Sequence, residues 1–288
     1  MYSANFDYYR ANSVAEAVSL LSAHPGAKLL AGGHSLLPQM KLRVAQPPAL
    51  IDIGRVGELK GITHADGKLH IGAMTTHDTV ATSDLVKEHC AVLAHTAGLI
   101  GDQQVRNRGT IGGSLAHADP AADLPTVLMA LGGTLTAVGP NGSRELACMD
   151  FCTDLFTTML HADEVLTRIS VPAYGTSAGG AYKKHEHPAS GYAVVGVAAM
   201  VMIAGGKCTG ARLAVCGATA KPAPAPAAEE ALMGKALDEA TIAAAAAKVA
   251  EAIVDPIGDH YASAEYRIHL ATVLARKAIT KAAKKAGA

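Results

Sequence analysis

Two pairs of adjacent glycines, each with a hydroxyl residue beside it, are the features of this sequence best suited to bind an anion. The first pair lies in Ala31-Gly32-Gly33-His34-Ser35 and the second in Thr110-Ile111-Gly112-Gly113-Ser114. Because glycine lets a backbone approach a ligand closely and adopt a positive φ, consecutive N–H groups can converge on a phosphate. Two such loops could bind a diphosphate without a lysine. Each could equally be an ordinary tight turn.

Two carboxylates follow the second glycine pair. Asp119 and Asp123 are four residues apart, a spacing that could serve paired carboxylates in acid–base chemistry. We favour a helix cap together with a contact to a ligand hydroxyl, because Asp123 stands before Leu124 and Pro125, as a cap does before a proline in the first turn. The sequence therefore offers binding groups here but no assignable catalytic residue.

Potential metal ligands occur only in incomplete pairs. His185-x-His187 and His117-x-Asp119 each place two such side chains two residues apart. On a strand, side chains with this spacing share a face without any metal. No third or fourth ligand follows at a suitable spacing, so we predict no metal site in this chain.

The cysteines are five in number and form no C-x-x-C pair. A scattered, odd set of cysteines indicates reduced thiols, as in a cytoplasmic protein. An iron–sulfur cluster needs four thiolates at close spacing, so we expect none here. The residues are Cys90, Cys148, Cys152, Cys208 and Cys216.

Composition and missing motifs exclude several functions. The formal net charge is zero and 17% of residues are charged, which argues against a nucleic-acid binder. The chain contains no dinucleotide-binding G-x-G-x-x-G after a strand, no phosphate-binding G-x-x-x-x-G-K-[ST] and no G-x-S-x-G hydrolase motif. Its longest apolar run, 193–204, is too short to cross a bilayer.

The elements that would position the glycine pairs follow from local patterns. Ser13-Val14-Ala15-Glu16 is a capping box and predicts a helix. Lys28-Leu29-Leu30 reads as a short buried strand that ends at the first glycine pair. A helix near 90–100 and a polar connector over 101–109 lead to the second pair.

At 288 residues the chain suggests about two domains. An Asn-Gly turn at 141–142 predicts a hairpin over 134–148. The glycines between Gly175 and Gly180 form the predicted domain boundary. Beyond it we expect three strands, at 181–185, 192–203 and 211–216. A Pro/Ala linker should follow at 221–227, and helices from 238 onward.

Taken together, these segments resemble a known family, the FAD-binding medium subunit of molybdenum hydroxylases. This family includes carbon monoxide dehydrogenase, bacterial xanthine dehydrogenase and related aldehyde or N-heterocycle dehydrogenases. The likeness covers nearly the whole chain and is clearest at residues 31–38, 105–114, 119–125 and 187–193.

The resemblance implies an α+β protein with a p-cresol methylhydroxylase-type FAD-binding fold. It implies an FAD-binding domain over 1–175, built of two α/β subdomains at about 1–54 and 55–175. A C-terminal flavoprotein domain over 176–288 would then hold a three-stranded antiparallel sheet with helices.

The resemblance also implies which residues contact the cofactor. The two glycine loops would hold the FAD diphosphate, Asp123 would contact the ribityl or ribose region, and Tyr192 would lie beside the isoalloxazine. Leu166 and Lys184 stand where the family also approaches FAD. The complete expected set is Leu30, Ala31, Gly32, Gly33, His34, Ser35, Thr110, Ile111, Gly112, Gly113, Ser114, Asp119, Asp123, Leu166, Lys184 and Tyr192.

By this likeness the chain is an electron-transfer subunit of an oxidoreductase. A large partner subunit would carry a molybdenum cofactor, and a small one two [2Fe–2S] clusters, from which FAD would pass electrons to NAD or a quinone-like acceptor. Ser114 stands where many relatives carry Asn, and the stretch 183–187 is less basic than in carbon monoxide dehydrogenases. Two alternatives stay open, a self-contained flavin reductase of the same fold and a nucleotide-binding scaffold without redox activity.

Overall fold

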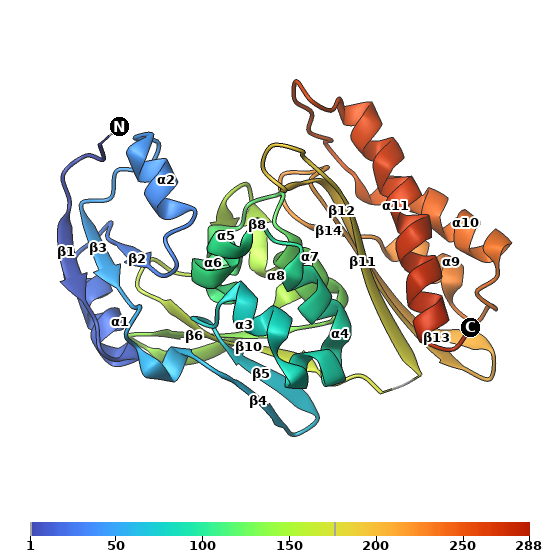
Figure 1. Ribbon diagram of the computed structural model, residues 1–288, viewed down its shortest axis with the longest axis horizontal. Coiled ribbons are helices and arrows are strands. Elements are labelled where there is room, and N and C mark those ends of the chain that lie inside the picture. The colour runs from blue at the N-terminus through green and yellow to red at the C-terminus, as the bar shows by residue number, and fades with distance from the viewer. Residues whose placement is uncertain (1, 176) are drawn as a thin grey trace.

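The computed structural model describes residues 2–175 and 177–288 of the chain, arranged around three main sheets. The sheets follow one another along the long axis of the molecule, with the N-terminal sheet at one end and the C-terminal sheet at the other (Figure 1). Helices pack between and beside them. The chain is therefore an α+β protein.

The first sheet is parallel, in the order β1-β3-β2, and its strand β2 ends just before the first glycine pair. Ser13 caps the helix α1, as predicted, by accepting from the Glu16 N–H, whereas the Glu16 carboxylate binds the N–H of Asn12 rather than that of Ser13. Strand β2 leads directly into the loop and then into α2. The bounds are β1 (Asp7–Arg10), α1 (Val14–Ala23), β2 (Lys28–Leu30), α2 (Leu36–Lys41) and β3 (Ala49–Asp52).

The second sheet is antiparallel, in the order β4-β5-β10-β6-β7. The predicted hairpin is confirmed by the pairing of β6 with β7. The helix predicted near 90–100 begins earlier, because Ser83 caps it, and it kinks at Cys90. The strands are β4 (Ile62–Ala65), β5 (Lys68–Gly72), β6 (Thr134–Gly139), β7 (Gly142–Ala147) and β10 (Val165–Pro172).

Six α-helices accompany this sheet, and three of them carry or precede the second glycine pair and Asp123. A 3-10 helix (Gly57–Leu59) and a small two-stranded sheet, β8 (Cys152–Asp154) with β9 (Thr157–Thr158), complete the region. The helices are α3 (His77–Thr82), α4 (Asp84–Gly98), α5 (Gln103–Arg108), α6 (Ile111–His117), α7 (Asp123–Ala130) and α8 (Cys148–Phe151).

The third sheet is antiparallel and has four strands, not the three predicted. The missed strand, β14, lies within the stretch expected to be a linker. There Ala225 is buried and donates from its N–H to the carbonyl of Leu213, so the stretch packs onto the sheet. The strands are β11 (Ala178–Glu186), β12 (Ala193–Ala204), β13 (Lys207–Cys216) and β14 (Ala223–Pro224).

Strand β12 is buried on both faces. Val195, Val197 and Val201 pack with α11, while Ala198 and Met200 alternate with them and belong to the core of the second sheet. Figure 1 shows the C-terminal helices on the outer face of the third sheet, and α4 and α7 on the face toward the second sheet. The helices are α9 (Pro226–Leu232), α10 (Glu239–Lys248), a 3-10 turn (Val249–Ala252) and α11 (Ala264–Lys285).

The predicted domain boundary, Gly175 to Gly180, includes residue 176, which lies outside the described residues. Strand β11 begins at Ala178, within that stretch. The Gly217 N–H donates to the Pro120 carbonyl, so the third sheet contacts the α6–α7 connection directly. Among the described residues, none of the helices combines the length and apolar character that a bilayer crossing requires.

Candidate functional site

A cavity of about 710 Å³ lies between the first glycine loop, helix α6, the start of α7 and the β11–β12 loop. Its size is within the range of small-molecule and cofactor sites. All but Leu30, Ile111 and Lys184 of the sixteen predicted site residues line it. Those that do are Ala31, Gly32, Gly33, His34, Ser35, Thr110, Gly112, Gly113, Ser114, Asp119, Asp123, Leu166 and Tyr192.

The first glycine loop presents a run of unused backbone donors. Within the part of the chain that the structure describes, the N–H groups of Gly32, Gly33, His34 and Ser35 donate no hydrogen bond. Gly33 has φ +77°, and its carbonyl accepts from Leu37, which turns the backbone back into α2. Successive amides around a left-handed residue form a concave anion-binding nest.

The glycine at position 32 has a packing role. A Cβ there would collide with the carbonyl oxygen of Arg108 and lie 2.9 Å from the Cα of Gly109. The loop therefore rests directly on the backbone that precedes the second glycine pair. This contact brings the two glycine-containing segments, about eighty residues apart, to one cavity.

The second glycine pair differs from its prediction, because its amides are already bound. The N–H groups of Ile111, Gly112 and Gly113 donate to the Thr75 carbonyl (3.0 Å), the Ala73 carbonyl (2.9 Å) and the Thr110 hydroxyl (3.1 Å). The expectation that these amides converge on an anion is therefore wrong here. The segment is the capped first turn of α6, and its residues Gly112, Gly113 and Ser114 line the cavity.

Asp123 was predicted to cap α7, but the capping position is held by Ala122, and Asp123 is the first residue of the helix. Its carboxylate is buried, accepts from the Tyr182 hydroxyl at 2.6 Å, and lies 3.3 Å from the Lys184 ammonium. Burial raises the pKa of Asp123, and the Lys184 charge opposes this shift. Tyr182, 1% exposed, was missed because a single aromatic residue in a strand predicts only core packing.

Lys184 lies outside the cavity lining and holds three segments together. Besides Asp123, its ammonium donates to the carbonyls of Leu99 (3.0 Å) at the end of α4 and Gly191 (2.8 Å) in the β11–β12 loop. Its side chain is 4% exposed. Lys184 therefore positions Asp123 and the loop that carries Tyr192.

Tyr192 and Leu166 provide contrasting walls of the cavity. Leu166 on β10 is buried, whereas Tyr192 is 46% exposed on the β11–β12 loop. Burial of its hydroxyl and the nearby Asp119 charge raise the pKa of Tyr192. The Tyr192 phenol therefore stays neutral at ordinary pH and can cover a flat ring.

His77 is a cavity residue that the sequence reasoning missed. It is 5% exposed, and its Nδ1 has no hydrogen-bond partner among the described residues. Burial, and secondarily the nearby His34, lower the pKa of His77 to about 4, so the ring is neutral at pH 7. A buried, unpaired ring nitrogen at a cavity wall fits a polar atom of a ligand. No sequence signal beyond its position after a strand marked it.

The remaining titratable clusters do not form a metal centre. Within residues 2–175 and 177–288, no group of three or more His, Cys, Asp or Glu side chains is arranged to hold a metal ion. His187 packs against the ring of Tyr261, with centroids 4.5 Å apart. The five cysteines are buried and unpaired.

Comparisons with known proteins identify the class to which this chain belongs. A family model described as "FAD binding domain in molybdopterin dehydrogenase" matches residues 4–174. A second, described as "CO dehydrogenase flavoprotein C-terminal domain", matches residues 180–282.

Individual relatives specify the class. The carbon monoxide dehydrogenase medium chain of Afipia carboxidovorans is 38% identical over 98% of both chains. The glyceraldehyde dehydrogenase medium chain of Sulfolobus acidocaldarius is 37% identical over 98% of this chain and 100% of its own. A carbon monoxide dehydrogenase structure from Hydrogenophaga pseudoflava superposes with a TM-score of 0.96 at 40% identity, covering 99% of each chain.

The chain belongs to the family of FAD-carrying medium subunits of molybdenum-containing dehydrogenases of the carbon monoxide and xanthine type. It is an oxidoreductase subunit whose own cofactor is FAD. The residues present fit that cofactor, because the unused amides of Gly32–Ser35 and the unpaired His77 nitrogen both border a cavity of suitable size.

Proposed function

We propose that this chain holds FAD in the 710 Å³ cavity and relays electrons from [2Fe–2S] clusters of a small partner subunit to an external acceptor, NAD or quinone-like. A large partner subunit would hold the molybdenum cofactor and oxidise the substrate. The observation that carries the proposal is the run of four unused amides from Gly32 to Ser35 at the cavity wall. Neutral backbone donors suit a diphosphate in a chain without net charge.

We propose a role for each of the residues around the cavity. The amides of the first loop bind the diphosphate, and the Ser114 hydroxyl adds a side-chain donor. Asp123, held by Tyr182 and Lys184, keeps lone pairs for a ribityl or ribose hydroxyl. Tyr192 covers the flat ring. When bound, FAD supplies the redox chemistry, and these side chains bind and orient it.

We also propose the domain division and the fold type. An FAD-binding domain over 1–175, with subdomains at about 1–54 and 55–175, precedes a C-terminal domain over 176–288. The separate family matches at 4–174 and 180–282 support this division. The parallel first sheet beside the antiparallel second sheet supports the p-cresol methylhydroxylase-type description.

A matched pair of valine substitutions tests the loop assignment. Gly33 and Gly67 both have positive φ, +77° and +68°, so valine strains the backbone at either site. Gly67 lies in the open turn between β4 and β5, away from the cavity. We expect Gly33→Val to lose flavin absorbance from the purified chain and Gly67→Val to retain it. Equal flavin content in both variants would contradict the proposal.

The spectrum of the unmodified chain separates the alternatives. A yellow chain that needs partner subunits for turnover supports the relay. Turnover with NAD(P)H by the isolated chain would instead favour a self-contained flavin reductase. A folded, colourless chain that takes up no added FAD would leave only a scaffold.

A further inference from the structure

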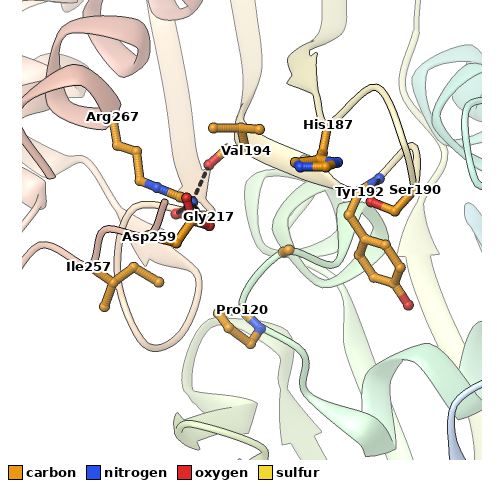
Figure 2. A pocket seen from close by; sticks show the side chains of 11 residues that line it. Pro120, His187, Ser190, Tyr192, Val194, Gly217, Ile257, Asp259 and Arg267 are labelled. Atoms are coloured by element: carbon orange, nitrogen blue, oxygen red, sulfur yellow. Dashed lines mark hydrogen bonds and ion pairs between the residues drawn. The ribbon is translucent and has the colours of Figure 1, made fainter. Parts of the chain in front are cut away.

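A second, smaller cavity adjoins the first and shares a wall with it. Its volume is about 260 Å³, and Tyr192, Ser190 and Ala121 line both cavities. Figure 2 shows His187, Ser190 and Tyr192 along one side, with the Tyr192 ring extending away from Arg267, which lies across the cavity. A ligand in the smaller cavity would thus be separated from the larger one by a single aromatic side chain and its loop.

The guanidinium group of Arg267, which lines this cavity, already has hydrogen-bond partners within the protein. Arg267 is 6% exposed and donates to the carbonyls of Val194 (2.8 Å) and Gly217 (2.5 Å), and to the Asp259 carboxylate (2.6 Å). Figure 2 shows this arrangement beside Ile257. Arg267 therefore offers no free charge to a phosphate, and the carboxylate of Asp259 would repel one.

Two neutral donors remain for a ligand. The Ala189 N–H donates to Nδ1 of His187 at 3.2 Å, so the neutral imidazole carries its proton on Nε2. That Nε2–H has no partner among the described residues, and neither does the hydroxyl proton of Ser190, whose oxygen accepts from the Tyr192 N–H. Besides Arg267 and Asp259, which bind each other, the wall includes the apolar side chains of Pro120, Val194 and Ile257.

We propose that this cavity binds the headgroup of a quinone, as the terminal electron acceptor of the chain. A quinone is flat and neutral, and it carries carbonyl oxygens that accept from His187 and Ser190. A dinucleotide is excluded from this cavity by size and charge, because 260 Å³ is below the usual range for drug-sized ligands and the residues that line the cavity offer no free cation to a phosphate. The proposal rests on the proposed function, since reduced FAD must lie beyond Tyr192.

The reaction balances without a further reagent. The quinone takes up two electrons and two protons to become a hydroquinone, and reduced FAD is reoxidised by loss of the same two electrons and two protons. Electrons cross the Tyr192 wall, while the protons exchange through solvent at the exposed loop.

The absence of tryptophan from the sequence gives a direct binding assay. Tyr261 is 45% exposed and its ring centroid lies 4.5 Å from that of His187, so Tyr261→Trp in the full-length chain places a single tryptophan beside the cavity. We expect saturable quenching of its fluorescence by menadione and none by NADH or NAD⁺. Adding His187→Phe or Ser190→Ala should each weaken menadione binding about fivefold, the usual effect of one lost hydrogen bond.

His185→Phe is the matched control, because His185 lies on the same strand end near Tyr261 but outside the cavity lining. It should leave binding unchanged. Quenching that does not saturate, equal binding in all three variants, or saturable quenching by NADH would overturn the proposal. In the flavin-loaded chain reduced with dithionite, reoxidation by menadione should slow in the two cavity variants only.

Failure of the two proposals can be told apart. Tryptophan quenching reports quinone binding whether or not flavin is bound. A chain that binds menadione but takes up no flavin would refute the relay, whereas a flavin-loaded chain without saturable quenching would refute the quinone site.

Discussion

Replacing Lys184 with methionine should destabilise the protein strongly, because this ammonium group is buried among three segments. It lies 3.3 Å from the Asp123 carboxylate and donates to the carbonyls of Leu99 and Gly191. Methionine keeps the length of the side chain but removes every donor. Removing one partner of a buried ion pair costs about 3–5 kcal/mol, since the other charge stays buried and uncompensated. We expect a loss of that size in the free energy of unfolding.

Urea denaturation of matched variants measures this loss. Lys183 is the preceding residue of the same strand and makes no ion pair among the described residues, so Lys183→Met should cost less than about 1 kcal/mol. The double variant Lys184→Met with Asp123→Asn removes the stranded charge and should recover part of the stability. If Lys184→Met cost no more than Lys183→Met, the argument for a buried clamp would fail.

The loss of stability in Lys184→Met should depend on pH. Burial already raises the pKa of Asp123, and the Lys184 charge now limits that rise. In Lys184→Met the pKa of Asp123 in the folded protein should therefore rise further. A carboxyl whose pKa is raised on folding contributes stability at low pH and loses it as the pH rises through the folded value. The defect should thus be smallest in acid and grow toward neutral pH.

Two further predictions concern residues around the main cavity. Because the pKa of His77 falls from an ordinary 6.5 to about 4, the unfolded chain binds a proton that the folded chain does not, so stability should fall by up to about 3 kcal/mol as the pH drops through this window. His77→Phe should abolish that loss in pH-dependent urea titrations and also weaken FAD binding; an unchanged pH profile would contradict the assignment. Gly112→Val should reduce folding itself, because a Cβ there would lie 2.5 Å from the Ala73 Cβ; normal circular dichroism and soluble yield would show that reasoning to be wrong.

Local signals predicted the parts of the fold and of the site that depend on neighbouring residues. The Ser13 cap, the strand before the first glycine loop, and the 134–148 hairpin each follow from a few adjacent side chains. The positive φ of Gly33 is likewise a local property of a turn. These features were predictable because the interactions that produce them span only a few residues.

Features set by distant partners were predicted wrongly or missed. The amides after Thr110 are bound by Ala73 and Thr75, which precede them by more than thirty residues, so a glycine pattern could not show that these donors were taken. The strand β14 forms because Ala223 pairs with Val215, although its own composition resembles a linker. In both cases tertiary contacts override the local pattern.

Lys184 is a residue whose role is set by tertiary contacts and not by its position in the sequence. Its position by family likeness suggested a cofactor contact, whereas its donors point to Asp123, Leu99 and Gly191 instead. Gly191 belongs to the loop whose His187, Ser190 and Tyr192 line the smaller cavity, and two of these also line the larger one. One buried ammonium therefore fixes both the carboxylate on the larger cavity and the wall between the two cavities. A change at Lys184 should alter flavin binding and acceptor binding together, although the side chain lines neither cavity.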